Sequence, residues 1–251
     1  MTSSMQHKGV VNAGRLSPVI WGNFPVKNAL VGLGGEMFMV DPFNINDISE
    51  DDRVGEGTAS WDSTNFAIDL TAGSVAEDAA VLSSRVKLSL SGRFAVEGSI
   101  NIDSIADSDN AVFVGFSAAR DGGFLVDSQD GSGAIAAGTV GVYIDRDKSG
   151  DETDSDSVSY DAGSLLIATR GDSGAARIKD SGSNVAAATA TKIGIVNRGD
   201  GIVRLFVDDT EVATDTMPTI ASGYAVIGTK AEGNGAPVLD IGRFFAAGVS
   251  D

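Results

Sequence analysis

The chain has 251 residues, of which 42% are hydrophobic, and it contains 32 glycines, 5 prolines and no cysteine. A hydrophobic content of this size supports a packed core and excludes wholesale disorder, and the lack of cysteine excludes disulfides and thiolate metal sites. The net charge of −17 would repel a nucleic-acid duplex, so nucleic-acid binding is excluded as a function.

The chain also lacks segments that would carry it into or across a membrane. No apolar run approaches the roughly 20 residues of a membrane-spanning helix. Residues 1–11 do not have the charged-then-apolar layout of a signal peptide. We therefore expect a soluble protein that is made in the cytoplasm and has no membrane partner.

The first 45 residues are predicted to form an extended N-terminal arm, because proline and glycine interrupt its apolar clusters and disfavour a long helix. Residues 1–35 contain no acidic side chain and carry a charge of +3, which leaves −20 for the rest of the chain. We expect the arm to dock either on its own body or on a neighbouring subunit. The apolar side chains that would make this contact are Val19, Ile20, Trp21, Phe24 and Val26.

Residues 46–251 are predicted to form one antiparallel β-sandwich domain. Short runs of alternating apolar and polar residues, separated by turns rich in Gly and Asp, are typical of strands in a sandwich or barrel. No stretch has a sustained helical period, and residues 73–85 would form at most a turn or two of helix. The predicted strands cover residues 66–70, 94–102, 112–116, 140–144, 165–168, 193–196, 202–207, 225–227 and 238–245.

One hairpin is clear in the sequence. Residues 191–197 alternate, residues 198–201 supply a turn of Arg, Gly, Asp and Gly, and residues 202–207 return as the second strand. A tight turn at Asp208 and Asp209 then leads into a small strand at residues 211–213.

This hairpin and the segments after it resemble a known fold. The stretches IGIVNRGDGIVRLFVDDTEVA, MPTIASGYAVIGTKAEG and PVLDIGRFFAAG resemble the closing half of concanavalin A-like (laminin-G-like) domains. The earlier FAVEGSINIDS and NAVFVGFSAA are similar to paired front-sheet strands of that fold. The resemblance implies an all-β jelly roll.

The whole chain also resembles structural proteins of tailed phages, which open with a short arm of the form W-G-x-x-P before such a sandwich. The segment VIWGNFP matches that opening. The resemblance implies a non-enzymatic virion structural protein, a capsid cement or decoration subunit anchored by its arm. Its partners would be the major capsid protein or other virion subunits, with self-association into a homo-oligomer on the capsid surface.

One loop, residues 145–156, has the spacing of a calcium loop. Oxygen-bearing side chains occupy the first, third and fifth positions, a glycine the sixth and a carboxylate the twelfth. The closing residue is Asp rather than the longer Glu, and no flanking helices are predicted, so an acidic, solvated hairpin tip is the alternative. The calcium ligands would be Asp145, Asp147, Ser149, Asp151 and Asp156, and no other cofactor is expected.

The sequence offers no catalytic apparatus, so we expect a protein that is not an enzyme. Glycosidases need two carboxylates facing each other across the sugar, and Glu97 stands alone on its predicted strand. The single histidine, His7, lies near the N-terminus, so no nucleophile–base–acid triad can be assembled in the sandwich.

The alternative function is a carbohydrate-binding, lectin-like module of a phage tail or cell-surface assembly. Sugar-binding sandwiches present exposed Trp or Tyr rings beside polar donors, although aromatic residues in strands more often belong to the core. The candidate rings are Trp61, Tyr143, Tyr160 and Tyr224.

Overall fold

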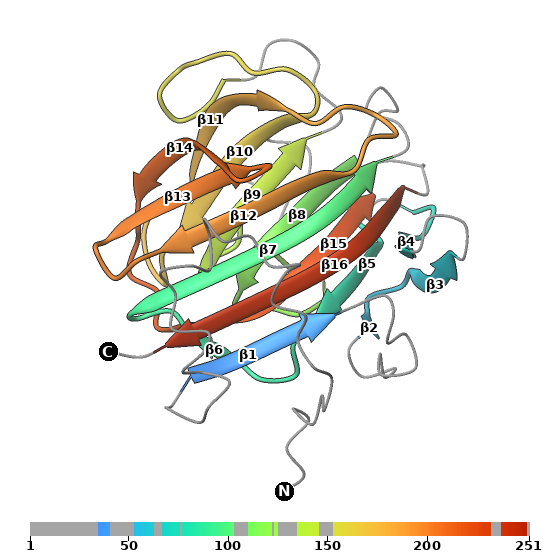
Figure 1. Cartoon of the computed structure of the whole chain (residues 1–251), viewed down its shortest axis with the longest axis horizontal. Coiled ribbons are helices and arrows are strands. Elements are labelled where there is room, and N and C mark those ends of the chain that lie inside the picture. Colours follow the sequence, from blue (N-terminus) through green and yellow to red (C-terminus); the bar gives the residue numbers. More distant parts are fainter. Residues whose placement is uncertain are drawn as a thin grey trace, which may run out of the picture.

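The protein is a sandwich of two antiparallel β-sheets, seen in a computed structural model of the chain (Figure 1). Every regular element among the described residues is a strand, and the predicted all-β fold is confirmed. No described segment forms a helix that is long and apolar enough to cross a membrane. The structure describes residues 35–40, 53–62, 67–75, 77–102, 110–121, 123–124, 135–145, 153–231 and 237–249.

Sheet A has eight strands, with the C-terminal strand near its middle. In Figure 1 its long strands run across the front of the molecule. In spatial order they are β14 (Thr210–Thr216), β13 (Ile202–Val207), β12 (Thr191–Asn197), β7 (Arg93–Ile102), β16 (Val238–Val249), β4 (Ala67–Thr71) and β3 (Thr58–Asp62), with β1 (Gly35–Val40) also paired to β16.

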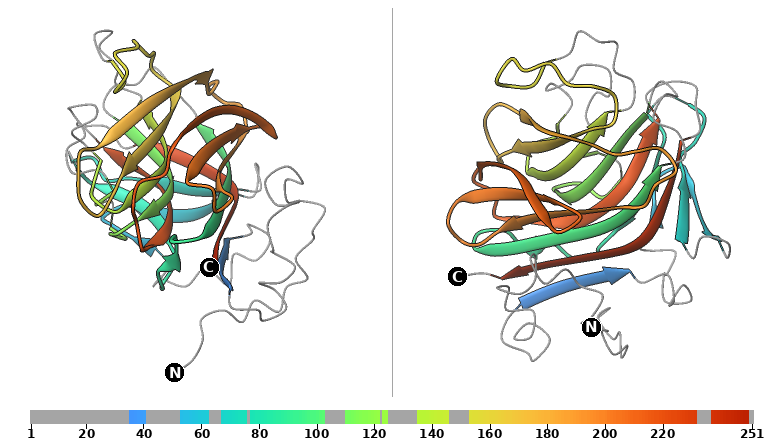
Figure 2. Two further views of the ribbon diagram at one scale, coloured as in Figure 1. Left: turned by 90° about the vertical axis from the view of Figure 1, so that its left-hand side faces the viewer. Right: turned by 45° about the horizontal axis from the view of Figure 1, so that its top comes forward.

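Sheet B packs behind sheet A, and the two layers separate in the turned views of Figure 2. It also has eight strands. In spatial order they are β11 (Arg177–Asn184), β10 (Ser164–Arg170), β9 (Thr139–Asp145), β8 (Asn110–Ser117), β15 (Ser222–Ala231), β5 (Ala79–Ser83) and β2 (Arg53–Val54), with β6 (Leu88–Ser89) also paired to β15.

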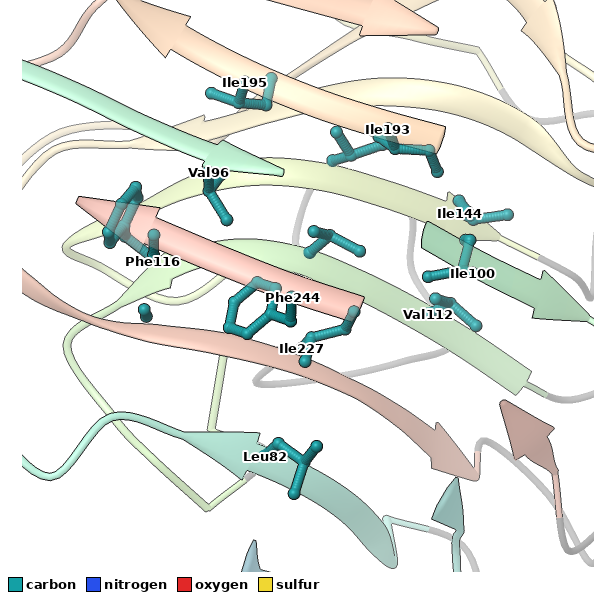
Figure 3. Packing of buried hydrophobic residues seen from close by; sticks show 14 of the residues in the cluster. Leu82, Val96, Ile100, Val112, Phe116, Ile144, Ile193, Ile195, Ile227 and Phe244 are labelled. Carbon is teal, nitrogen blue, oxygen red and sulfur yellow. The ribbon is translucent and has the colours of Figure 1, made fainter. Parts of the chain in front are cut away.

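The main core fills the space between the two sheets. Alternate residues of each strand point inward, as the period of two requires. Figure 3 shows this packing: Val96, Ile100 and Phe244 come from sheet A, and they face Val112 and Ile227 of sheet B. All are at most 1% exposed, so these side chains are removed from solvent on folding.

A second cluster covers the outer face of sheet B. Phe113 on β8 stacks on Phe124, which lies in the connection between β8 and β9, with ring centroids 4.9 Å apart and planes 16° apart. Tyr160, from the connection between β9 and β10, is buried in the same cluster. Sheet B is therefore covered on both faces, and strands such as β5 are apolar at nearly every position rather than at alternate ones.

The structure confirms the predicted hairpin, in which β12 and β13 pair antiparallel from Ile193 opposite Val207 to Asn197 opposite Val203. It also confirms the tight turn that follows the hairpin. Asp208 and Asp209 both have positive φ angles, +45° and +69°, as a two-residue I′ turn requires. Within residues 73–85 the structure has the strand β5 rather than a turn of helix. Within the predicted arm, β1 pairs antiparallel with β16, from Gly35 opposite Val249 to Val40 opposite Phe244.

Candidate functional site

The predicted partner-binding residues of the arm, Val19, Ile20, Trp21, Phe24 and Val26, lie outside the described residues. Three of the predicted calcium ligands, Asp147, Ser149 and Asp151, also lie outside them. Asp145 ends β9, and Asp156 is described. No group of three or more acidic or histidine residues that could hold a metal ion occurs within the described ranges. The calcium site stays a prediction.

Asp156 already has a cationic partner. Both of its carboxylate oxygens accept hydrogen bonds from Nη2 of Arg177, at 2.9 and 3.0 Å. The Nε of Arg177 donates to both oxygens of Asp215 on β14, at 2.8 and 3.0 Å. Arg177 therefore connects the edge strand of sheet B to the edge strand of sheet A, and Asp156 contributes to that connection.

Asp154 organises the turn that contains Asp156. Its carboxylate is 6% exposed and accepts hydrogen bonds from the backbone N–H groups of Asp156, Val158 and Asp180, at 2.9, 2.8 and 3.0 Å. Burial alone would raise the pKa of Asp154, but these three donors and the charge of Arg177 outweigh it and hold the pKa below its usual value. Asp154 is thus a structural carboxylate that is ionised at neutral pH.

The four candidate sugar-binding rings divide into two groups. Tyr143 and Tyr160 are 0% and 2% exposed and belong to the cluster on the outer face of sheet B, so they cannot serve as platforms for a ligand. Trp61, on the edge of sheet A, and Tyr224, on β15 of sheet B, are partly exposed. Tyr224 has two cations over its ring.

Lys87 and Arg120 both lie over the ring of Tyr224. The Nζ of Lys87 is 5.3 Å from the ring centroid, and the guanidinium carbon of Arg120 is 5.7 Å from it. Such cation–π contacts contribute about 0.5–1 kcal/mol each at exposed positions. We call these three residues the Tyr224 site. It lies on the outer face of sheet B, where Tyr224 also packs against the second cluster.

The loop that carries Lys87 is held against β15. The hydroxyl of Ser84 donates to the carbonyl of Val86 at 2.8 Å and accepts from the N–H of Ala225 at 3.0 Å. The N–H of Ser84 also donates to the carbonyl of Ala225 at 2.9 Å. Since Ala225 is next to Tyr224, these bonds hold the loop that carries Lys87 beside the strand that carries the ring.

Arg120 is held by a row of buried hydroxyl groups on neighbouring strands. Its Nε donates to the Oγ of Ser83 at 3.4 Å, and the adjacent N–H of Ala119 donates to the Oγ of Ser117 at 3.2 Å. Ser117 lies opposite Tyr224 in the sheet register and also accepts a hydrogen bond from Thr139, at 3.4 Å. Ser83, Ser117 and Thr139 are fully buried, so the site has a rigid polar floor.

Lys87 and Tyr224 keep their polar atoms available. Within the described part of the chain, neither the ammonium of Lys87 nor the hydroxyl of Tyr224 makes a hydrogen bond or an ion pair with the protein. Lys87 itself is exposed, and its neighbour Val86 is 46% exposed. The arrangement offers a ligand an aromatic ring, a hydroxyl and an ammonium group over the ring.

Sequence reasoning identified Tyr224 as one of four candidates but missed Lys87 and Arg120. The three residues lie in segments far apart along the chain, and only the strand order of sheet B brings them together. The sequence around a cation in a loop does not show which aromatic ring the cation will contact in the folded protein.

Glu97, the acidic residue that stands alone on its predicted strand, is not part of the Tyr224 site. It lies on β7 and is fully buried on the face of sheet A that points away from the main core. Its Oε1 accepts a hydrogen bond from Nη2 of Arg243 on β16, at 2.6 Å. This ion pair links the two central strands of sheet A, which is a structural role.

Comparison with known proteins identifies the fold. No protein-family model and no curated protein match the chain. Among solved structures, the carbohydrate recognition domain of Emp47p is similar, with a TM-score of 0.54 and 12% identity over 87% of this chain and 99% of that domain. Peanut lectin, solved with a nine-residue peptide, has a TM-score of 0.52 and 14% identity over 85% of this chain and 97% of the lectin.

A legume lectin-like domain from Entamoeba histolytica is also similar, with a TM-score of 0.51 and 11% identity over 90% of this chain and 93% of that domain. At these identities the likeness shows the fold alone. The chain has the jelly-roll sandwich of the legume lectins, and the predicted concanavalin A-like fold is confirmed. The resemblance to phage structural proteins stays a prediction.

Proposed function

We propose that the protein is a non-enzymatic, lectin-like module that binds carbohydrate at the Tyr224 site. The observation that carries this proposal is the ring of Tyr224, which is partly exposed on a sheet face with Lys87 and Arg120 over it. Sugars present apolar C–H faces and many hydroxyl groups, and an aromatic ring beside fixed polar donors complements both. The lectin-type neighbours of the fold support the same class of ligand.

A glycan array tests this proposal. The wild-type protein should bind a subset of glycans selectively, with dissociation constants of about 1 mM or below. Tyr224→Ala should weaken that binding about tenfold or more, as truncation of a central aromatic anchor does. Trp61→Ala is the matched control, because it removes the other partly exposed candidate ring from the edge of sheet A and should leave binding unchanged.

Thermal melting of both variants would show that each is folded. Failure of the wild-type protein to bind any glycan would contradict the proposal. Selective binding that survives Tyr224→Ala and is lost with Trp61→Ala would keep a lectin but reject this site.

A virion role, as a capsid decoration subunit on the capsid surface, is the second candidate. The observation that favours it is β1, because its pairing with β16 alone places Gly35 at an edge of sheet A. An arm that starts there could reach a major capsid protein or a second copy of the chain, after synthesis in a host cytoplasm.

Deletion of residues 1–34 tests the second candidate, since it keeps β1 in place. The truncated protein should stay folded and lose co-sedimentation with capsids. Unchanged decoration of capsids by the truncated protein would show that the arm is not the anchor.

A further inference from the structure

We propose that the Tyr224 site selects anionic sugars, with Lys87 binding their carboxylate or sulfate group. This inference rests on the proposed carbohydrate binding and narrows it to one chemical class. It is based on the two cationic side chains of the site, Lys87 and Arg120, in a molecule with a net charge of −17.

Lys87 stands apart from the other described lysines. Lys179 donates to the carbonyl of Thr214 at 2.8 Å, Lys192 pairs with Asp209, and Lys230 pairs with Glu77. Lys87 has only the ring of Tyr224 as a partner among the described residues. The chain has 35 acidic and 18 basic side chains, so a lysine held in place without a carboxylate is unusual within it.

Two cations lie over the ring of Tyr224, the ammonium of Lys87 and the guanidinium of Arg120. The excess of negative charge elsewhere on the molecule would repel an anion at long range. At physiological ionic strength this repulsion is screened beyond about 8 Å, whereas a cation in contact with the ligand is not.

The free-energy cost of removing water from Lys87 explains why the site should prefer an anionic sugar to a neutral one. A sugar that packs against Tyr224 removes water from the ammonium of Lys87, which costs free energy unless another group compensates the charge. A neutral sugar compensates it only with hydroxyl dipoles. A carboxylate or sulfate supplies an opposite charge and a charge-assisted hydrogen bond, and the hydroxyl of Tyr224 is available as a second donor.

Isothermal titration with charged and neutral forms of one sugar tests the proposal. The probes are an oligogalacturonate, its methyl-esterified form, in which each carboxylate is replaced by a neutral methyl ester, and a sulfated galactan oligosaccharide of similar length. The wild-type protein should bind the free acid or the sulfated sugar about two- to fivefold more tightly than the ester, the range expected for one exposed ion pair.

Lys87→Gln should abolish this difference, because the affinities for the free acid and the sulfated sugar should fall to that for the ester. Lys192→Gln is the matched control: it removes the same charge from β12 of sheet A and should preserve the difference. Preference for the free acid alone would identify a carboxylate as the ligand group, and preference for the sulfated sugar alone would identify a sulfate.

Equal affinity for acid, sulfated sugar and ester would overturn the anionic preference while leaving carbohydrate binding intact. A preference that persists in Lys87→Gln would overturn the role of Lys87. Binding of none of these sugars or of any array glycan would contradict the proposed function itself.

Discussion

Buried charged side chains connect strands and hold a turn in this sandwich. Glu97 and Arg243 join β7 to β16, and Asp154 holds the turn after β9 through three backbone donors. A buried ion pair adds little compared with apolar residues of the same volume, but removal of one partner is costly because the other charge stays buried.

Arg243→Ala should therefore lower the free energy of unfolding by about 3–5 kcal/mol. Urea titration measures this loss. The double variant Glu97→Gln/Arg243→Ala is the control, and it should recover part of the stability because no charge remains at the position. A loss below about 1 kcal/mol in the single variant would show that the pair is not structurally important.

The stability of the protein should fall as the pH drops below about 4. The pKa of Asp154 is lowered in the folded state, and the hydrogen bond from Arg204 lowers the pKa of Asp200 to about 2. A group with a depressed folded pKa stabilises the fold above its unfolded pKa, and this contribution disappears as the pH falls through the folded pKa.

Asp154→Asn isolates the buried carboxylate. At pH 6 the variant should be about 1–3 kcal/mol less stable than the wild type, because an amide nitrogen replaces one of the accepting oxygens. Between pH 6 and pH 2 it should lose less stability than the wild type does. Chemical denaturation at both pH values measures this, and equal acid sensitivity of the two proteins would contradict the role of Asp154.

Strands with alternating or bulky apolar residues are visible in the sequence, and short strands of small or polar residues are not. The alternating residues of β7 and β13 predicted strands that the structure confirms. The run of Ala and Val in β5 has no alternation because sheet B is covered on both faces, so its period gave no strand signal. β11 is a polar edge strand with one buried apolar residue, Ile178, which explains why it was not predicted.

Gly141 leaves room for the ring of Phe113 to pack closely on sheet B. A Cβ at Gly141 would lie 2.5 Å from Cζ of Phe113 and 2.6 Å from the carbonyl oxygen of Val114. Gly141→Ala should therefore destabilise the protein by about 1–3 kcal/mol through overpacking.

Gly242→Ala is the matched control for this substitution, because the three atoms nearest to its Cβ would all belong to Ser99, the closest 3.3 Å away. Thermal or urea unfolding of both variants measures the effect. Equal stability of the two variants would contradict the close approach of the Phe113 ring to the strand.

At the scale of the whole molecule, an acidic jelly roll carries a small basic site on one sheet face. The fold was predictable because turn chemistry and alternation agree along most of the chain. Only the ring of the Tyr224 site could be predicted, since its two cations lie in loops that follow other strands. The sequence also predicted Tyr143 and Tyr160 as candidates, and both are buried because loops cover the outer face of sheet B.

A crystal structure of the full chain with the best glycan from the array would show whether the sugar binds at the Tyr224 site. We expect a sugar ring packed against Tyr224, with an oxygen of the sugar within hydrogen-bond distance of Nζ of Lys87. A glycan bound elsewhere on the sandwich, with an unoccupied Tyr224 site, would contradict it.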